Sequence, residues 1–331
     1  VPGLSDEVEG AACTVQLVDT GEILAAASYP TFHLDTYVED YAENSTDPLK
    51  PLMNRAFQGL YPPGSTFKMV TLSTALQDGV TTEETEYQSP GVMEIGNAKV
   101  SNVDNNEYGT ISLARATEVS SNTVFGQVGV QLGPERLVEG AEKFGFNKNI
   151  DFDLPLATSL MPDPDEMTEW ETAWAAAGEP VGEHESPAGP QATVLEMALV
   201  GCAIANEGTI MQPYLVDGIY NANGERSFTG QPTKLMQAVD AGTAERVLKV
   251  LEGVVSNGSG AAAAVEGVTV AGKTGTAERG DGTADSWFVG IAPAENPRVV
   301  VAIAIEKGDS GEGARKAQNV LKTALEVQGL V

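Results

Sequence analysis

The amino-acid sequence predicts a mixed α/β (α+β) fold, in which an antiparallel β-sheet built from both chain ends is flanked by helices and carries a mostly helical insertion. Three observations support this fold class. Two apolar runs separated by a turn, residues 13–19 and 22–28, lie near the N-terminus. Three strand-like runs, residues 268–278, 286–293 and 298–306, lie near the C-terminus. The residues between the two groups are mostly helical in pattern.

The two N-terminal runs indicate a β-hairpin. CTVQLVD (13–19) and EILAAAS (22–28) are joined by Thr20 and Gly21. A short connection that contains glycine, placed between two apolar runs, is typical of a hairpin turn. Residues 29–60 are polar, and we expect them to be irregular.

The helical patterns begin at Ser65. The first runs to about Gln77 and closes at Asp78 and Gly79, with the glycine past its end. Four more helices are expected in the middle of the chain, over residues 111–132, 134–145, 168–177 and 191–206, the last ending near Gly208. Two helices accompany the C-terminal strands, over residues 242–255 with Thr243 near the cap, and over residues 314–328.

We expect the whole chain, residues 1–331, to form one domain, because no Pro/Gly/Ser-rich linker divides it. Within it, residues 1–75 and 240–331 are expected to form a sheet subdomain, and residues 76–239 a mainly helical subdomain. The active site of such a fold is expected between the two parts.

The composition excludes some functions. The chain has 331 residues and a net charge of -28. Nucleic acid is a poor partner for this charge, because its phosphates would be repelled. The acidic stretches YVEDYAENSTD (37–47) and MPDPDEMTEWE (161–171) are interpreted as solvated loops and faces. A salt-rich source organism would give the same signal.

The cysteines and histidines predict no metal site and no histidine-based triad. Cys13 and Cys202 lack a CxxC partner, so two free thiols are favoured, with a single disulfide as the alternative in an exported protein. His33 and His184 are each isolated. No stretch of about 18 apolar residues is present. The opening VPGLSDEVEG is interpreted as a cut into a longer protein.

The stretch YPPGSTFKMV (61–70) allows two interpretations. Ser65 and Lys68 are one helical turn apart, so the lysine amine can reach the serine hydroxyl. Ser65 is then a nucleophile and Lys68 its base, provided that burial or a second cation lowers the lysine pKa. The alternative is a serine that only caps a helix and a solvated lysine.

Two further motifs favour the nucleophile. Ser120 and Asn122 form S-x-N in the helical middle, and Lys273, Thr274 and Gly275 form K-T-G on a C-terminal strand. A glycine in an edge strand allows close approach of an extended peptide, and Lys and Thr can bind its carboxylate. In the order S-x-x-K, S-x-N, K-T-G, the three motifs are the signature of the penicillin-binding protein and serine β-lactamase superfamily.

At these residues the chain resembles the transpeptidase domain of a class B, monofunctional penicillin-binding protein. The resemblance extends to DTGEILAAASYPTF (19–32), NRAFQGLYPPGSTFK (54–68) and WFVGIAP (287–293), and covers nearly the whole chain. It implies a penicillin-binding transpeptidase fold without a cofactor. One departure is GPQATVLEMALVGCAIANEG (189–208), which replaces the usual G-Q-G…T-P-L-Q-M-A pattern. The hairpin at residues 20–21 is also shorter than usual.

The resemblance implies a peptidoglycan D,D-transpeptidase in which Ser65 attacks the penultimate D-Ala of a D-Ala-D-Ala stem peptide. Lys68 would take the serine proton. Ser120, aided by Lys273, would relay a proton to the leaving amine. Asn122 would bond the substrate amide and orient Lys68. Repulsion between the two lysines, together with desolvation, is expected to lower the pKa of Lys68.

The resemblance also implies the substrate-binding groups and the partners. Thr274, Gly275 and Thr276 would bind the terminal carboxylate end, and the backbone N–H groups of Ser65 and Thr276 would form the oxyanion hole. An amine of a neighbouring stem would resolve the acyl-enzyme, whereas a β-lactam would stay on Ser65. The implied location is the extracytoplasmic face of the bacterial membrane, beside a membrane glycosyltransferase. The family's membrane helix and pedestal domain are absent from this sequence.

Three alternatives stay open: a β-lactamase, a D,D-carboxypeptidase of the same superfamily, and a non-catalytic division scaffold. A class A β-lactamase would need a deacylating glutamate in an E-x-x-L-N loop. EPVGEHESP (179–187) contains acids without that arrangement. Related class D enzymes usually have valine where Asn122 stands. The intact motif residues argue against a retired scaffold.

Overall fold

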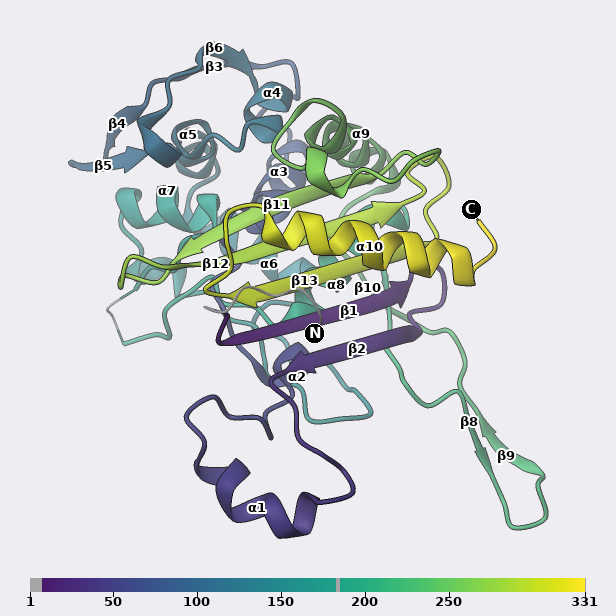
Figure 1. The fold of residues 1–331 in the computed structure, drawn as a ribbon. Helices are drawn as coiled ribbons and strands as arrows, with labels where there is room; N and C mark the ends of the chain where they lie inside the picture. The colour runs from purple at the N-terminus through teal and green to yellow at the C-terminus, as the bar shows by residue number, and fades with distance from the viewer. Residues whose placement is uncertain (1–7, 183–184, 331) are drawn as a thin grey trace.

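A five-stranded antiparallel sheet built from both ends of the chain forms the centre of the molecule (Figure 1). The structure is a computed structural model that describes residues 8–182 and 185–330. The strand order is β11-β12-β13-β1-β2, with β13 paired antiparallel to β1. The strands are β1 (Gly10–Leu17), β2 (Ile23–Tyr29), β11 (Ala271–Glu278), β12 (Ala284–Ala292) and β13 (Val299–Glu306). The predicted hairpin and the joining of the two chain ends in one sheet are confirmed.

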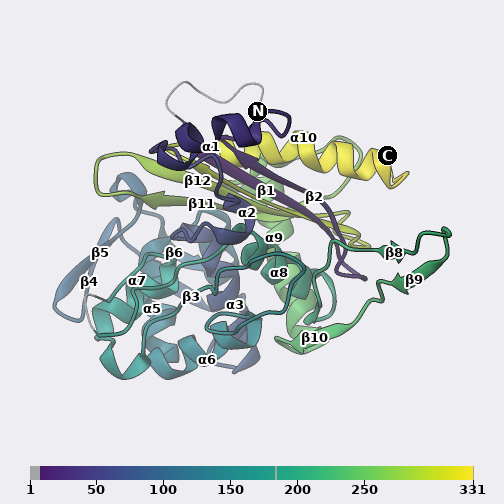
Figure 2. The same cartoon turned by 90° about the horizontal axis from the view of Figure 1, so that it is seen from below.

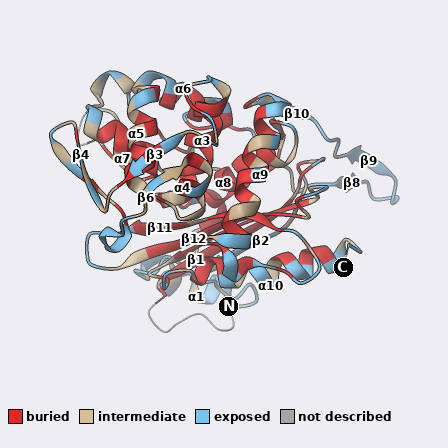
Figure 3. Ribbon diagram, turned by 90° about the horizontal axis from the view of Figure 1, so that it is seen from above, coloured by how far each residue is buried: buried red, intermediate tan, exposed pale blue. Residues whose placement is uncertain are grey.

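Helices cover both faces of this sheet. Helix α10 (Glu312–Val327) lies across one face and α8 (Val194–Ala205) across the other (Figure 2). Because both faces are covered, β13 is buried from its first residue through Ile305. Figure 3 shows most of the sheet and α8 as buried. Coverage of both faces explains why VVVAIAI in β13 shows no alternation of apolar and polar residues.

The middle of the chain contributes most of the remaining helices. They are α3 (Lys68–Gln77), α4 (Leu113–Glu118), α5 (Asn122–Leu132), α6 (Pro134–Phe144), α7 (Glu169–Ala177) and α9 (Ala241–Asn257). The side chain of Asp240 caps α9 by accepting a hydrogen bond from the backbone N–H of Thr243. Short 3-10 turns are η1 (Gly64–Phe67), η2 (Val103–Asn105), η3 (Pro164–Glu166) and η4 (Ala261–Ala263).

The middle of the chain is mostly but not wholly helical, because four two-stranded sheets also lie among its described residues. The pairs are β3 (Glu86–Ser89) with β6 (Gly109–Ser112), β4 (Val92–Ile95) with β5 (Ala98–Ser101), β7 (Thr209–Met211) with β10 (Lys234–Gln237), and β8 (Gly218–Tyr220) with β9 (Arg226–Thr229). Each strand has three or four residues. Such strands are too short to carry a recognisable period of two.

Two other predictions need correction. Residues 111–132 are not one helix, because β6 extends to Ser112 and the chain breaks between α4 and α5. Ser112 and Ser121 each accept a hydrogen bond from a backbone N–H in the first turn of the helix that follows, so each starts a new helix. Residues 29–60 are not wholly irregular, since they contain α1 (Tyr37–Thr46) and α2 (Arg55–Gln58). No residue of α1 is buried, so its sequence carries no core-facing stripe.

Cys13 and Cys202 are free thiols, so the disulfide alternative is wrong. Cys202 is buried in α8, and Cys13 in β1 is partly buried. His33 is exposed, and His184 lies outside the described residues. Among the residues that the structure describes, no helix is both long and apolar enough to cross a membrane.

Glu196 is a carboxyl group buried in α8. Its Oε1 atom has no hydrogen-bond partner among the described residues, and burial raises its pKa to about 8. In the unfolded chain this group ionises near its ordinary pKa, whereas the folded protein keeps it protonated up to about pH 8. Stability is therefore lost as the pH rises between these two values, by about 1.4 kcal/mol per pH unit.

We expect Glu196→Gln to remove this loss. The free energy of unfolding of the variant should match or fall below that of the wild type near pH 4.5 and exceed it by about 2–3 kcal/mol near pH 7. Urea unfolding at several pH values measures the difference. Glu245→Gln is the control, because Glu245 is exposed on α9. A difference between Glu196→Gln and wild type that is constant with pH would contradict the interpretation.

Candidate active site

Ser65 lies in the 3-10 turn η1, which runs directly into α3. Pro63 precedes this turn, and Phe67 precedes the first residue of α3, so Ser65 occupies neither N-cap position. Its Oγ accepts a hydrogen bond from Lys68 Nζ at 2.7 Å. The predicted proximity of these two side chains is confirmed. The alternative of a helix-capping serine with a solvated lysine is wrong, because Lys68 is completely buried.

Lys68 Nζ has four polar neighbours. Besides Ser65 Oγ, they are Asn122 Oδ1 at 2.6 Å, Ser120 O at 3.1 Å and Ser120 Oγ at 3.2 Å. Asn122 is the first residue of α5, and its Nδ2 donates to Ser101 O at 2.9 Å. This second hydrogen bond fixes the orientation of the amide so that its oxygen faces the lysine.

Ser120 lies between α4 and α5 in a left-handed backbone conformation, with φ of 59°. A residue other than glycine rarely adopts this conformation, and such strained positions cluster at functional sites. The Ser120 hydroxyl is within hydrogen-bond distance of both lysines, since Lys273 Nζ donates to it at 2.9 Å. Lys273 also donates to Thr274 O at 3.1 Å. The turn between the helices therefore places one hydroxyl between two amines.

Burial controls the charge of both lysines. It is the main cause that lowers the pKa of Lys68 well below its ordinary value, and the charge of Lys273 lowers it further. The charge of Glu179 opposes this shift. Burial also lowers the pKa of Lys273 to about 7. A lysine with a lowered pKa is available as a neutral amine near pH 7, which is the form that can accept a proton.

Two glycines bring β11 against the turn that carries Ser65. A Cβ atom at Gly64, which has φ of 52°, would lie 2.6 Å from Thr276 O. A Cβ atom at Gly275 would lie 2.8 Å from Pro63 O. Any side chain at these positions would separate the two backbones. K-T-G thus supplies a close approach as well as functional groups.

Strand β11 is an edge of the sheet, and Thr274 and Thr276 on it are partly exposed. Ser259 lies in the loop after α9, and its Oγ is 2.8 Å from Thr274 Oγ1, within hydrogen-bond distance. This contact could not be predicted from the sequence, because SNGSG (256–260) has the composition of an ordinary loop. The other group that the sequence did not reveal is Glu179, just after α7, whose charge acts on Lys68.

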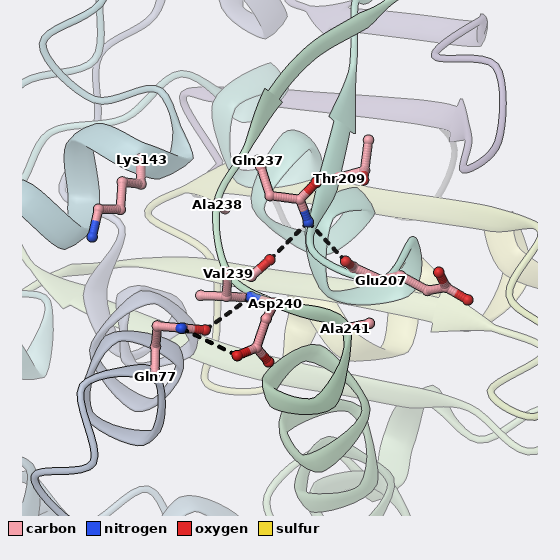
Figure 4. Close-up of a pocket in the computed structure, with 9 residues that line it drawn as sticks. All are labelled: Gln77, Lys143, Glu207, Thr209, Gln237, Ala238, Val239, Asp240 and Ala241. Atoms are coloured by element: carbon pink, nitrogen blue, oxygen red, sulfur yellow. Dashed lines mark hydrogen bonds between the residues drawn. The ribbon is translucent and has the colours of Figure 1, made fainter.

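A separate groove of about 590 Å³ lies between α3, α6 and the strand pair β7–β10 (Figure 4). Gln77 accepts from the backbone N–H of Asp240 and donates to its carboxylate there, and Gln237 donates to two backbone carbonyls. None of the predicted site residues lines this groove. The described residues contain no cluster of three His, Cys, Asp or Glu side chains that would hold a metal ion.

Comparisons with known proteins agree with the fold and the motifs. The family described as "Penicillin binding protein transpeptidase domain" matches residues 11–326. Peptidoglycan D,D-transpeptidase PbpA of Mycolicibacterium smegmatis is 31% identical over 307 residues, covering 87% of this chain and 60% of that relative. PbpA of Mycobacterium tuberculosis is 30% identical over the same length. The chain thus spans about 60% of the length of these curated relatives.

Solved structures of penicillin-binding proteins have a similar fold. The D,D-transpeptidase domain of a peptidoglycan glycosyltransferase from Eggerthella lenta is 61% identical, with a TM-score of 0.94, covering 98% of this chain and 80% of that one. An imipenem acyl-enzyme complex of penicillin-binding protein A from M. tuberculosis is 28% identical, with a TM-score of 0.85, covering 95% of this chain and 73% of that one.

Proposed function

The chain belongs to the family of penicillin-binding protein transpeptidase domains, and we propose from this premise that it is a peptidoglycan D,D-transpeptidase with Ser65 as its nucleophile. The observation that carries the proposal is the 2.7 Å separation between Ser65 Oγ and the buried amine of Lys68. The names of the relatives and the acyl-enzyme complex of a structural neighbour support the same reaction class.

In the proposed acylation step, neutral Lys68 accepts the proton of Ser65. A neutral amine has two N–H donors and one lone pair. Donation to Asn122 Oδ1 and Ser120 O leaves the lone pair for the Ser65 hydroxyl. As the proton leaves, Ser65 Oγ bonds the carbonyl carbon of the penultimate D-Ala. The backbone N–H groups of Ser65 and Thr276 are proposed to stabilise the resulting oxyanion.

The proposed roles of the other motif residues follow from their contacts. Ser120 bridges the two lysines and passes a proton to the departing D-Ala amine. Thr274 and Thr276, partly exposed on the edge strand, hydrogen-bond the substrate carboxylate, and Gly275 lets the peptide lie close to the strand. Lys273 adds a positive charge for that carboxylate. An amine of a neighbouring stem then takes the acyl group, which cross-links the cell wall.

The setting of the reaction is part of the same proposal. Residues 1–75 and 240–331 act as the sheet part, and residues 76–239 as the mainly helical part, of one transpeptidase domain. The natural protein works at the extracytoplasmic face of the membrane, anchored by an N-terminal helix. Its partners are stem peptides, β-lactams and a membrane glycosyltransferase.

A labelling experiment tests the proposed reaction. The protein is incubated with a fluorescent penicillin and digested, the labelled peptide is identified by mass spectrometry, and the adduct is followed over hours. A persistent adduct on the peptide containing Ser65 supports a transpeptidase. An adduct on Ser65 that disappears within minutes indicates a β-lactamase. Absence of any adduct would contradict the proposal that the protein is an enzyme of this class.

The rate of acylation is expected to depend on pH between 6 and 9. Acidification protonates the lowered-pKa amine of Lys68 and removes the base. As the pH rises through the Lys273 pKa of about 7, this lysine loses its positive charge, which weakens carboxylate binding. The second-order rate constant for penicillin should therefore rise and then fall as the pH increases. A flat profile over this range would refute the assignment of both lysines.

A further inference from the structure

Glu179 lies beside the turn that carries Ser65. It follows Gly178, which ends α7 in a left-handed conformation with φ of 102°. A Cβ atom at Gly178 would lie 1.8 Å from Gly64 O and 3.1 Å from Phe67 Cβ. These two contacts are with residues on either side of Ser65. The end of α7 is thus pressed against the nucleophile turn, and Glu179 is the next residue along.

The Glu179 side chain is partly buried and faces charges from two other elements. They are Lys68 on α3, which lowers the pKa of Glu179, and Glu278 on β11, which raises it. Burial is the larger effect and raises this pKa to about 7. Glu179 and Lys68 form no ion pair within 4.0 Å. Glu179 therefore acts on the reacting centre without occupying the hydrogen-bonding positions around Lys68.

The second half of the proposed reaction needs such a group. The acceptor is an amine, and an aliphatic amine is mostly protonated at neutral pH. An ammonium group cannot attack a carbonyl carbon, and it is repelled by the positive charge that Lys273 carries when it is protonated. A carboxylate at the edge of the site attracts the ammonium and can accept its proton. A group whose pKa is near the working pH is suited to that exchange.

We propose that Glu179 binds the protonated amine of the acceptor stem peptide and removes its first proton. This inference rests on the proposed function. The ammonium transfers one proton to Glu179, and the neutral nitrogen bonds the carbonyl carbon of the Ser65 ester. The second proton passes by way of Lys68 to Ser65 Oγ as the ester C–O bond breaks. The products are a new amide, a free Ser65 hydroxyl and protonated Glu179, which then loses its proton to water.

Glu179→Gln tests the proposal, because it removes the charge and the basic oxygen while keeping the size of the side chain. The acyl-enzyme is formed from an acyl-D-alanyl thioester and offered one of two acceptors at pH 7. Glycinamide is largely protonated there, and hydroxylamine is neutral. We expect amide formation with glycinamide to fall by about 100-fold. The ratio of amide to hydroxamate should fall with it, and this ratio does not depend on any change in the acylation rate that follows from removing the Glu179 charge near Lys68.

Glu169→Gln is the matched control, since Glu169 is exposed at the other end of α7. Equal losses with both acceptors in Glu179→Gln would overturn the proposal, because they would mean that Glu179 acts only through Lys68 and Ser65. A loss confined to hydrolysis of the acyl-enzyme would also overturn it and assign Glu179 to water. If Glu179→Gln is acylated normally and forms the amide at the wild-type rate, the inference about Glu179 is overturned while the proposed function stands. Failure of the wild type to be acylated by penicillin overturns the proposed function as well.

Discussion

Methionine in place of Lys68 is expected to slow the acylation of Ser65 by a β-lactam by about 10³-fold. Lys68 Nζ is the nitrogen that contacts Ser65 Oγ, at 2.7 Å, and its lowered pKa leaves it able to accept the serine proton. Methionine is similar in length and apolar, so it fills the same buried space without a base. Stopped-flow fluorescence with a labelled penicillin measures the rate constant. Ser65→Ala measures the background rate of labelling, because it lacks the nucleophile.

Lys322→Met is the control for a general effect of lysine replacement. Lys322 is on α10 with 63% of its side chain exposed, so its replacement should leave the acylation rate unchanged. Urea unfolding of Lys68→Met establishes that the fold persists. Acylation of this variant at the wild-type rate would show that another group accepts the serine proton.

Sequence spacing predicted the pair Ser65 and Lys68, because residues three apart in a helical turn are neighbours whatever the rest of the fold does. The order of S-x-x-K, S-x-N and K-T-G then predicted that Ser120, Asn122 and Lys273 join them, and the hydrogen bonds of Lys68 and Lys273 agree. The sheet was predictable for a similar reason. Its strands are apolar runs bounded by turn-rich segments, which is a local pattern that predicts strands.

Other parts of the site depend on tertiary contacts that leave no local signal. Ser120 was expected within one long helix, whereas two serine caps break that helix and leave Ser120 at a positive φ. Glu179 opens EPVGEHESP (179–187), which the sequence showed only to lack the E-x-x-L-N arrangement of a class A β-lactamase. Its charge acts on Lys68 because Gly178 allows α7 to end against Gly64, a contact between distant parts of the chain. The contact between Ser259 and Thr274 joins a loop to strand β11, and neither sequence indicates the pairing.

Arg55→Met is expected to lower the free energy of unfolding by about 3–5 kcal/mol. Arg55 lies in α2, with 4% of its side chain exposed, and its Nε donates to Glu306 Oε1 at 2.7 Å. It also donates to the backbone carbonyls of Leu49 and Lys50. Methionine would leave these acceptors without a donor, and the largely buried Glu306 charge would keep only the longer contact with Arg279, at 4.0 Å. Tyr61, just before the nucleophile turn, donates to the same Glu306 oxygen at 2.9 Å, so the approach to Ser65 should loosen too.

Urea unfolding and the acylation rate together test this effect. Arg298→Met is the control, because Arg298 pairs with Asp19 at 3.4 Å while both side chains are well exposed, and an exposed pair contributes at most about 1 kcal/mol. Adding Glu306→Gln to Arg55→Met should restore part of the lost stability, since it removes a buried charge that the single variant leaves only weakly compensated by Arg279. If the double variant is instead less stable by the sum of the two single losses, the cost does not come from an uncompensated charge. The ion pair would then act on the fold only through packing and backbone hydrogen bonds.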